Sequence, residues 1–282
     1  MSPSPPSVCI TGIGVLGPGF TGWPQTRELL RDGSAWRTAA TVLPPPARLA
    51  AAERRRSGAI VRLSLAVADE ACAMAGADAQ RIATVFASSA ADTANCHALC
   101  ETLAQPERAV SPTRFTNSVH NAPAGYWHIA TASRAPSTSL CAHDASFGAG
   151  LLEAMAQCVA WQRSVLLVCA DVPYPMPLYA LRPLPDAFGV ALVLDQAPGA
   201  AGLARLTVRG AGDADADRRA AAPDVDATMA LDDALAALAG AVPAGRCLPL
   251  LAAIARGCAA TLAPDGLRAS GLVIDVRPGA GA

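Results

Sequence analysis

Short apolar runs alternate with longer segments of helical spacing along the first two thirds of the chain. Apolar residues at helical spacing predict a helix over residues 62–75, which ends at Gly76, and a second helix over residues 145–161. Five short apolar runs predict buried strands, at residues 8–13, 82–88, 137–140, 164–170 and 189–194. Short apolar strands that alternate with long helices are typical of a layered α/β fold.

The pattern changes after residue 195. Residues 198–226 are rich in Gly, Ala and Asp, which predicts a loop or a domain boundary. Helical spacing returns at 231–238 and 248–260, and residues 272–276 have the composition of a strand. We therefore predict two parts, a domain over residues 1–195 and a shortened C-terminal region over residues 196–282.

The composition narrows the function classes. Of the 282 residues 52% are hydrophobic and 16% are charged, as expected for a globular chain with a large core, and the net charge of −1 favours neither nucleic acid nor an anionic membrane as a partner. All 22 basic residues are arginine, which excludes Schiff-base chemistry on lysine. No apolar stretch is long enough for a membrane span, and nine scattered cysteines suit a reducing compartment, so we expect a cytoplasmic protein.

Three local motifs are better explained by structure than by ligand binding. Residues 12–17 match the consensus sequence of a dinucleotide-binding fingerprint. A Pro-Gly pair follows directly, so no helix can begin close enough for its N-terminus to contact a pyrophosphate. Residues 54–56, three arginines, are typical of a solvated helix face. Cys96, His97 and Cys100 lack a nearby fourth ligand for zinc. We expect no metal and no cofactor.

The most informative turn carries Cys141, His143 and Asp144 between a predicted strand and a predicted helix. Cysteine nucleophiles are commonly placed at a helix N-terminus, because the helix dipole lowers the pKa of the thiol. The helix is expected to begin at Asp144, so an aspartate occupies the position that such a nucleophile would have. We interpret Asp144 as an N-cap that accepts a hydrogen bond from the amide of Ser146 or Phe147.

These segments resemble the β-ketoacyl synthases, which have the thiolase-like α-β-α-β-α fold. Ile-Thr-Gly-Ile-Gly at residues 10–14 is similar to their first strand and turn, and Phe188–Leu194 resembles the strand that closes their first half. Residues 111–125, which include Asn121 and Gly125, resemble the segment that leads into the active site.

The segment Ala-Pro-Ser-Thr-Ser-Leu, with Pro136 and Ser139, resembles the family's strand that delivers the nucleophile. Counting without gaps from Pro136 places the family's cysteine position on Asp144. The combination of Asn-Ser-Val-His-Asn-Ala-Pro-Ala-Gly with this segment is closer still to the chain length factors of aryl polyene and related polyketide or fatty-acid pathways. The resemblance covers roughly residues 8–195, the N-terminal half of a synthase.

The departures from the family concern the catalytic groups. A synthase uses a thiolate to carry the acyl chain and two histidines, or a histidine and an asparagine, from its second half to assist decarboxylation. This sequence has four histidines, and none follows residue 143. A carboxylate at Asp144 would give a reactive anhydride instead of a stable thioester, and the loss of one donor to a developing oxyanion typically costs about 10²–10³ in rate. The chain alone is not expected to condense acyl groups.

The resemblance therefore implies a non-catalytic subunit that pairs with a complete synthase through residues 137–140. Apolar segments around Phe115, Tyr126 and Trp127 would be buried in that heterodimer. The helix over residues 145–161 would line the partner's acyl tunnel, and the bulk of Phe147 or Met155 would limit the chain length of the product. An acidic acyl carrier protein is the expected further partner, with arginines as contacts.

Two alternatives remain open from the sequence. Cys141 and His143 are two residues apart, so on a continued strand both side chains would point the same way, as in an independent acyl-transfer or hydrolytic enzyme. The second alternative is a degenerate synthase half that binds a carrier protein alone.

Overall fold

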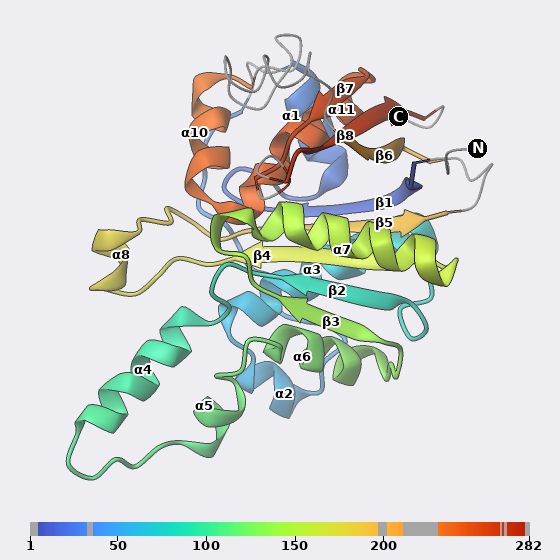
Figure 1. The fold of residues 1–282 in the computed structure, drawn as a ribbon. Coiled ribbons are helices and arrows are strands. Elements are labelled where there is room, and N and C mark those ends of the chain that lie inside the picture. The colour runs from blue at the N-terminus through green and yellow to red at the C-terminus, as the bar shows by residue number, and fades with distance from the viewer. Residues whose placement is uncertain are drawn as a thin grey trace.

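The computed structural model describes residues 5–32, 36–196, 202–210, 231–265, 267 and 270–279. The described strands form one mixed sheet in the order β3-β2-β4-β5-β1-β6-β8-β7 (Figure 1). Their bounds are β1 Ser7–Leu16, β2 Ala83–Ala87, β3 Ser137–Leu140, β4 Val165–Asp171, β5 Phe188–Asp195, β6 Ala204–Gly210, β7 Ala260–Leu262 and β8 Leu272–Pro278.

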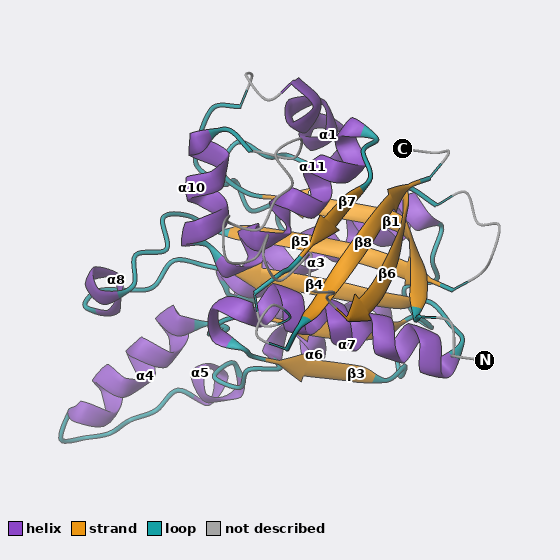
Figure 2. Ribbon diagram, turned by 45° about the horizontal axis from the view of Figure 1, so that its top comes forward, coloured by secondary structure: helices purple, strands orange, loops and turns teal. Residues whose placement is uncertain are grey.

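Three neighbouring strands, β3, β2 and β4, are parallel, whereas every other described strand pair is antiparallel. β3 therefore lies at one edge of this sheet and pairs on one side only, with β2. The sheet twists along its length, so that β6 and β8 run obliquely across the direction of β1, β4 and β5 (Figure 2).

Helices cover both faces of the sheet (Figures 1 and 2). The two main layers are α3 with α6 on one face and α7 with α11 on the other. The helices are α1 Trp23–Asp32, α2 Ala51–Arg56, α3 Ala59–Ala75, α4 Thr93–Ala104, α5 Pro112–Thr116, α6 Ala122–Thr131, α7 Ser146–Trp161, α8 Leu178–Leu181, α10 Asp233–Ala241 and α11 Leu248–Arg256, with 3₁₀ turns η1 His143–Ala145 and η3 Pro243–Cys247.

Two hydrophobic cores result, one on each face. Consecutive residues of β4 alternate between them: Leu166 packs with α3 and Leu167 with α7. Because β2 and β4 are buried on both faces, they read as continuous apolar runs in the sequence. All five strands predicted in the first 195 residues are present, and the predicted strand over residues 137–140 has those same bounds.

The long predicted helix over residues 62–75 is also confirmed, although it begins earlier, at Ala59. It ends at Gly76, whose φ of 61° lies in the left-handed region that a glycine adopts without steric cost. The helix predicted over 248–260 is shorter than expected. Gly257 ends α11 in the same left-handed conformation, and β7 follows.

The prediction of a loop or boundary over residues 198–226 was wrong for residues 204–210, which form β6 between β1 and β8. The reason is local alternation: Ala204, Leu206 and Val208 are buried, while the residues between them are not. Residues 197–201 and 211–230 lie outside the described part of the chain.

The C-terminal region contributes to the core on the α7 face. Leu206, Leu251 and Ile274 belong to the same buried cluster as Phe147. The division of the chain at residue 195 stays a prediction. Among the described residues, no helix combines the length and the apolar character needed to cross a membrane.

Candidate functional site

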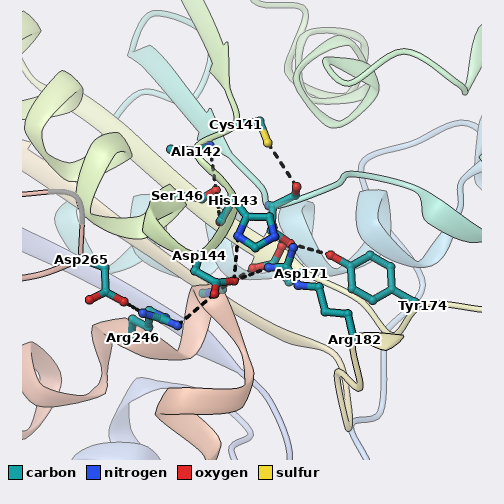
Figure 3. Close-up of polar contacts among 12 residues, drawn as sticks. Cys141, Ala142, His143, Asp144, Ser146, Asp171, Tyr174, Arg182, Arg246 and Asp265 are labelled. Carbon is teal, nitrogen blue, oxygen red and sulfur yellow. Dashed lines mark hydrogen bonds and ion pairs between the residues drawn. The ribbon is translucent and has the colours of Figure 1, made fainter. Parts of the chain in front are cut away.

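The candidate site lies where the parallel strands end. β3 leads into η1 and then into α7, so the turn that carries Cys141, His143 and Asp144 lies at the carboxyl end of the sheet (Figure 3). Ligands of α/β sheets bind at this end, because the loops that follow the strands diverge there. The first turn of α7 and the η3 turn lie beside these residues.

Asp144 is the centre of a charged cluster that draws on three segments of the chain (Figure 3). One carboxylate oxygen pairs with the guanidinium of Arg182, which follows α8, and lies 3.4 Å from Nδ1 of His143. The other oxygen lies 3.5 Å from Nη2 of Arg246 in η3, and Arg246 also pairs with Asp265. The arginine side chains are 28% and 24% exposed, so Asp144 compensates two charges that water reaches only in part.

The predicted N-cap role of Asp144 was wrong. The residue before α7 is Ala145, which makes no side-chain cap, and Asp144 lies inside the 3₁₀ turn η1. The hydroxyl of Ser146 organises the turn instead: it donates to the carbonyl of His143 at 2.7 Å and accepts from the amide of Ala142 at 3.1 Å. The extra turn moves Asp144 away from the first amides of α7 and toward the arginines.

Cys141 and His143 do not form a nucleophile and base pair. The Cys141 thiol donates to the carbonyl of Ser89, with sulfur and oxygen 3.1 Å apart, and the imidazole of His143 faces Asp144 (Figure 3). No hydrogen bond joins Cys141 to His143, both of which the structure describes. The expected common direction was wrong because β3 ends at Leu140 and His143 has a φ of 52°, so strand alternation does not extend to these residues.

A buried carboxylate near the site was not predicted. Asp171 ends β4 and is 2% exposed. It accepts hydrogen bonds from the amides of Ser89 (2.7 Å) and Ala244 (2.8 Å) and from the hydroxyl of Ser88 (3.3 Å). Burial raises the pKa of the Asp171 carboxyl, and these hydrogen bonds partly oppose that change. The sequence signal that could have predicted this carboxylate was an aspartate directly after the apolar run Val-Leu-Leu-Val-Cys-Ala.

Buried thiols elsewhere are poor nucleophiles. Burial raises the pKa of the Cys169 and Cys247 thiols well above the usual range, so both remain protonated. Within the described ranges, no three His, Cys, Asp or Glu side chains come together as a metal site would require.

The remaining predicted site residues are not gathered around Asp144. Asn121 and Gly125 are exposed at the start of α6, Pro136 is exposed just before β3, and Ser139 is half-buried on β3. Asn121 and Gly125 thus belong to the start of the helix that precedes the edge strand in the chain, and Pro136 and Ser139 belong to the edge strand and the residue before it.

The predicted tunnel and interface residues lie deeper than expected. Phe147 and Met155 are each 1% exposed and belong to the core on the α7 face, so they have no free surface to offer a partner. Tyr126 and Trp127 are buried between α6 and the α3 face of the sheet, which corrects their assignment to an interface. The reason is that α6 packs its aromatic side on the chain's own core. Phe115, by contrast, is 69% exposed.

The family is shown by a sequence model. The model for the β-ketoacyl synthase N-terminal domain matches residues 24–240, well over half of the chain, and the protein therefore belongs to this family. No curated protein matches its sequence at a significant level.

Solved structures share the fold. A chain of the ketosynthase ApeO in complex with its chain length factor ApeC from Xenorhabdus doucetiae aligns with a TM-score of 0.65 at 21% identity, over 96% of this chain and 99% of that chain. A chain of the ishigamide ketosynthase/chain length factor aligns with a TM-score of 0.66 at 16% identity, over 96% and 98%. A β-ketoacyl synthase from Burkholderia phymatum STM815 aligns with a TM-score of 0.58 at 14% identity, over 84% and 70%. The expected thiolase-like α/β fold is confirmed.

Proposed function

We propose that this protein is a non-catalytic chain length factor, which pairs with a complete β-ketoacyl synthase in the cytoplasm and shapes the partner's acyl tunnel. The observation that carries the proposal is the state of Asp144. At the position where the family resemblance expects a nucleophilic cysteine, this chain has a carboxylate held by Arg182 and Arg246. A carboxylate in two ion pairs is neither a thiolate nor free to attack a thioester.

The share of each solved chain that aligns with this chain supports the same proposal. The chains from the two ketosynthase–chain length factor complexes are covered almost completely by this chain, whereas the Burkholderia synthase is covered over 70%. This chain is thus similar to a chain of each of these two complexes over nearly its whole length. We further propose an aryl polyene-type pathway, on the basis of the sequence resemblance, with an acyl carrier protein as the source of acyl groups.

The edge strand β3 supports the position of the partner. The carbonyl of Pro136 accepts a hydrogen bond from the amide of Thr84 in β2, and that of Leu140 accepts one from Ser88, directly after β2. By the period of two along a strand, the backbone groups of Ser137 and Ser139 therefore face the free edge. An unpaired edge is a template for a strand from another chain. We propose that the synthase adds its equivalent strand here and that Phe115 contacts it.

The residues expected to limit chain length act indirectly in this proposal. Phe147 and Met155 hold α7 against the sheet, and α7 in turn sets the position of η1 and β3 at the edge. A change in their volume would reach the partner's tunnel through the position of α7, because close-packed cores transmit strain.

Co-expression with a candidate synthase from the same genome, followed by a condensation assay with malonyl and acyl carrier substrates, tests the proposal. We expect a mixed complex that elutes as one species, product from the complex, and no product from this chain alone. Carbon–carbon bond formation by the isolated chain would refute the proposal. Separate elution of the two proteins would refute the pairing.

Two variants of one residue test the β3 edge. Ser139→Pro removes the amide that faces the free edge and leaves the ladder to β2 intact, so we expect a weakened complex from a folded chain. Ser139→Val keeps that amide and should assemble like the wild type. Equal assembly of both variants would place the partner elsewhere.

A further inference from the structure

Two exposed thiols lie next to each other on α4, outside the candidate site. Cys96 and Cys100 are four residues apart in a helix of 12 residues, and both side chains are exposed. Side chains at this spacing lie on the same face of a helix, with their Cβ atoms about 5–6 Å apart. The helix projects from the body of the molecule (Figures 1 and 2), so solvent reaches this face.

The part of α4 that carries the pair is held in place by its surroundings. A carboxylate oxygen of Asp92 caps the helix by accepting from the amide of Asn95 at 2.9 Å. The side-chain amide of Asn95 donates to the carbonyl of Arg114 in α5 at 2.8 Å, and Leu99 packs on the buried side. The two thiols are therefore presented by a fixed helix, and little ordering is needed before a ligand can bind both.

The two thiols also influence each other. Partial burial raises the pKa of the Cys96 thiol, and the neighbouring Cys100 raises it further, through its charge and through a hydrogen bond. Two thiolates at this distance repel each other. A cation bound between them would remove that repulsion.

The adjacent polar side chains do not add ligands to the pair. Nε2 of His97 lies 3.3 Å from Oε1 of Glu101, so these two side chains contact each other. In the part of the chain that the structure describes, no three His, Cys, Asp or Glu side chains come together. The pair thus offers two ligands, fewer than the four that a structural zinc takes.

The spacing favours a bridging ion over a disulfide. A disulfide needs Cβ atoms about 3.5–4.5 Å apart, and a regular helix holds this pair farther apart than that. A metal–thiolate bond is about 2.3 Å long for zinc, so an ion of similar size between two opposed thiolates separates the sulfur atoms by about 4.6 Å. An ion can therefore join Cys96 and Cys100 without unwinding α4.

We propose that Cys96 and Cys100 form a two-coordinate site for a soft monovalent metal ion, Cu(I). Thiolates are ligands that select Cu(I), and this ion accepts linear coordination by two ligands. On binding, two S–H bonds break, two S–Cu bonds form and both protons pass to solvent. No electron is transferred, so the step needs no oxidant. The site does not depend on the proposed pairing with a synthase.

The test measures Cu(I) binding by the reduced full-length chain under anaerobic conditions, in competition with bicinchoninate, a chelator whose Cu(I) complex is coloured. We expect one ion per chain. Cys96→Ser and Cys100→Ser should each bind at least about a hundredfold more weakly, because even the loss of a group that only supports a metal ligand costs about 10–100-fold. Both positions are exposed, so the variants should fold, which circular dichroism checks.

Two controls separate the spacing from the mere presence of thiols. Cys100→Ala/Ala98→Cys keeps nine cysteines but places the second thiol two residues from Cys96, on another face of the helix, and should bind as weakly as the single variants. Cys141→Ser removes an exposed thiol from a different segment and should change the affinity less than twofold. The site is refuted if the wild-type chain takes no Cu(I) from the chelator, or if the variant with the moved thiol binds as tightly as the wild type.

Discussion

The two ends of strands β2, β3 and β4 use arginine in opposite ways. At the carboxyl ends, Arg182 and Arg246 converge on Asp144, and the charges compensate each other inside the chain. At the starting ends, three arginines line a depression and form no ion pair in the described residues: Arg81, Arg134 and Arg163. The difference teaches that the charges at the carboxyl ends are compensated within the chain, whereas those at the starting ends face solvent.

The carboxyl ends of the parallel strands also hold η3 in place. Asp144 contacts Arg246 in η3, and Asp171 contacts the amide of Ala244 in the same turn. Two carboxylates at the ends of the parallel strands therefore fasten η3 to the first part of the sheet.

The largest effect is expected at Asp171. Asp171→Ala leaves the buried amides of Ser89 and Ala244 without an acceptor, and we expect the free energy of unfolding to fall by about 3 kcal/mol. Chemical denaturation measures it. Asp233→Ala, which removes an exposed carboxylate from the first turn of α10, should cost less than about 1 kcal/mol. Similar losses for both variants would mean that Asp171 does not fasten η3.

A smaller effect is expected at Asp144. Asp144→Ala leaves two partly buried guanidinium groups without this carboxylate, but Arg246 keeps Asp265, so a loss of about 1 kcal/mol is expected. The condensing activity of the complex with a synthase should persist. Glu28→Ala, which breaks an exposed pair with Arg31, is the control and should change stability by less than about 0.5 kcal/mol. Complete loss of product from a folded Asp144→Ala complex would indicate chemistry at this residue.

A pH-dependent effect should follow from the buried carboxyl. Because burial raises the pKa of Asp171 above its unfolded value of about 3.8, the folded state binds the proton more tightly. The stabilisation that the Asp171 carboxyl contributes to the folded state is therefore fully present below about pH 3.8. It is lost as the pH rises through the pKa that this carboxyl has in the folded state. Asp171→Asn does not titrate, so the advantage of the wild type over this variant should shrink with rising pH across that window. An advantage that grows with pH would contradict the raised pKa.

The smallest effect is expected at the exposed thiol. Cys141→Ala removes one hydrogen bond to the carbonyl of Ser89, and the output of the complex should stay within twofold of the wild type. Mass spectrometry after treatment with an acyl-thioester probe should find Cys141 unmodified. A stoichiometric acyl adduct on Cys141 would support the independent enzyme instead.

The sequence predicted the elements of the fold better than the contacts between them. The strand over residues 137–140 and the helix that comes after it were correct because periodicity and turn residues are local. β6 was missed because its alternation is short and stands in a Gly- and Ala-rich region. The partners of Asp144 could not be predicted, since Arg182 and Arg246 come from segments that only the fold brings together.

By itself, the sequence determined the chemical groups that the chain has and lacks: no cysteine at the family's nucleophile position, no histidine after residue 143 and no lysine. Only the tertiary structure decided which charges are compensated, that Phe147 and Trp127 lie inside the chain's own cores, and that three arginines meet at the starting ends of neighbouring strands. The physical reason is that residue identity and periodicity are properties of neighbours in sequence. Burial and ion pairing depend on segments that become neighbours only when the sheet forms.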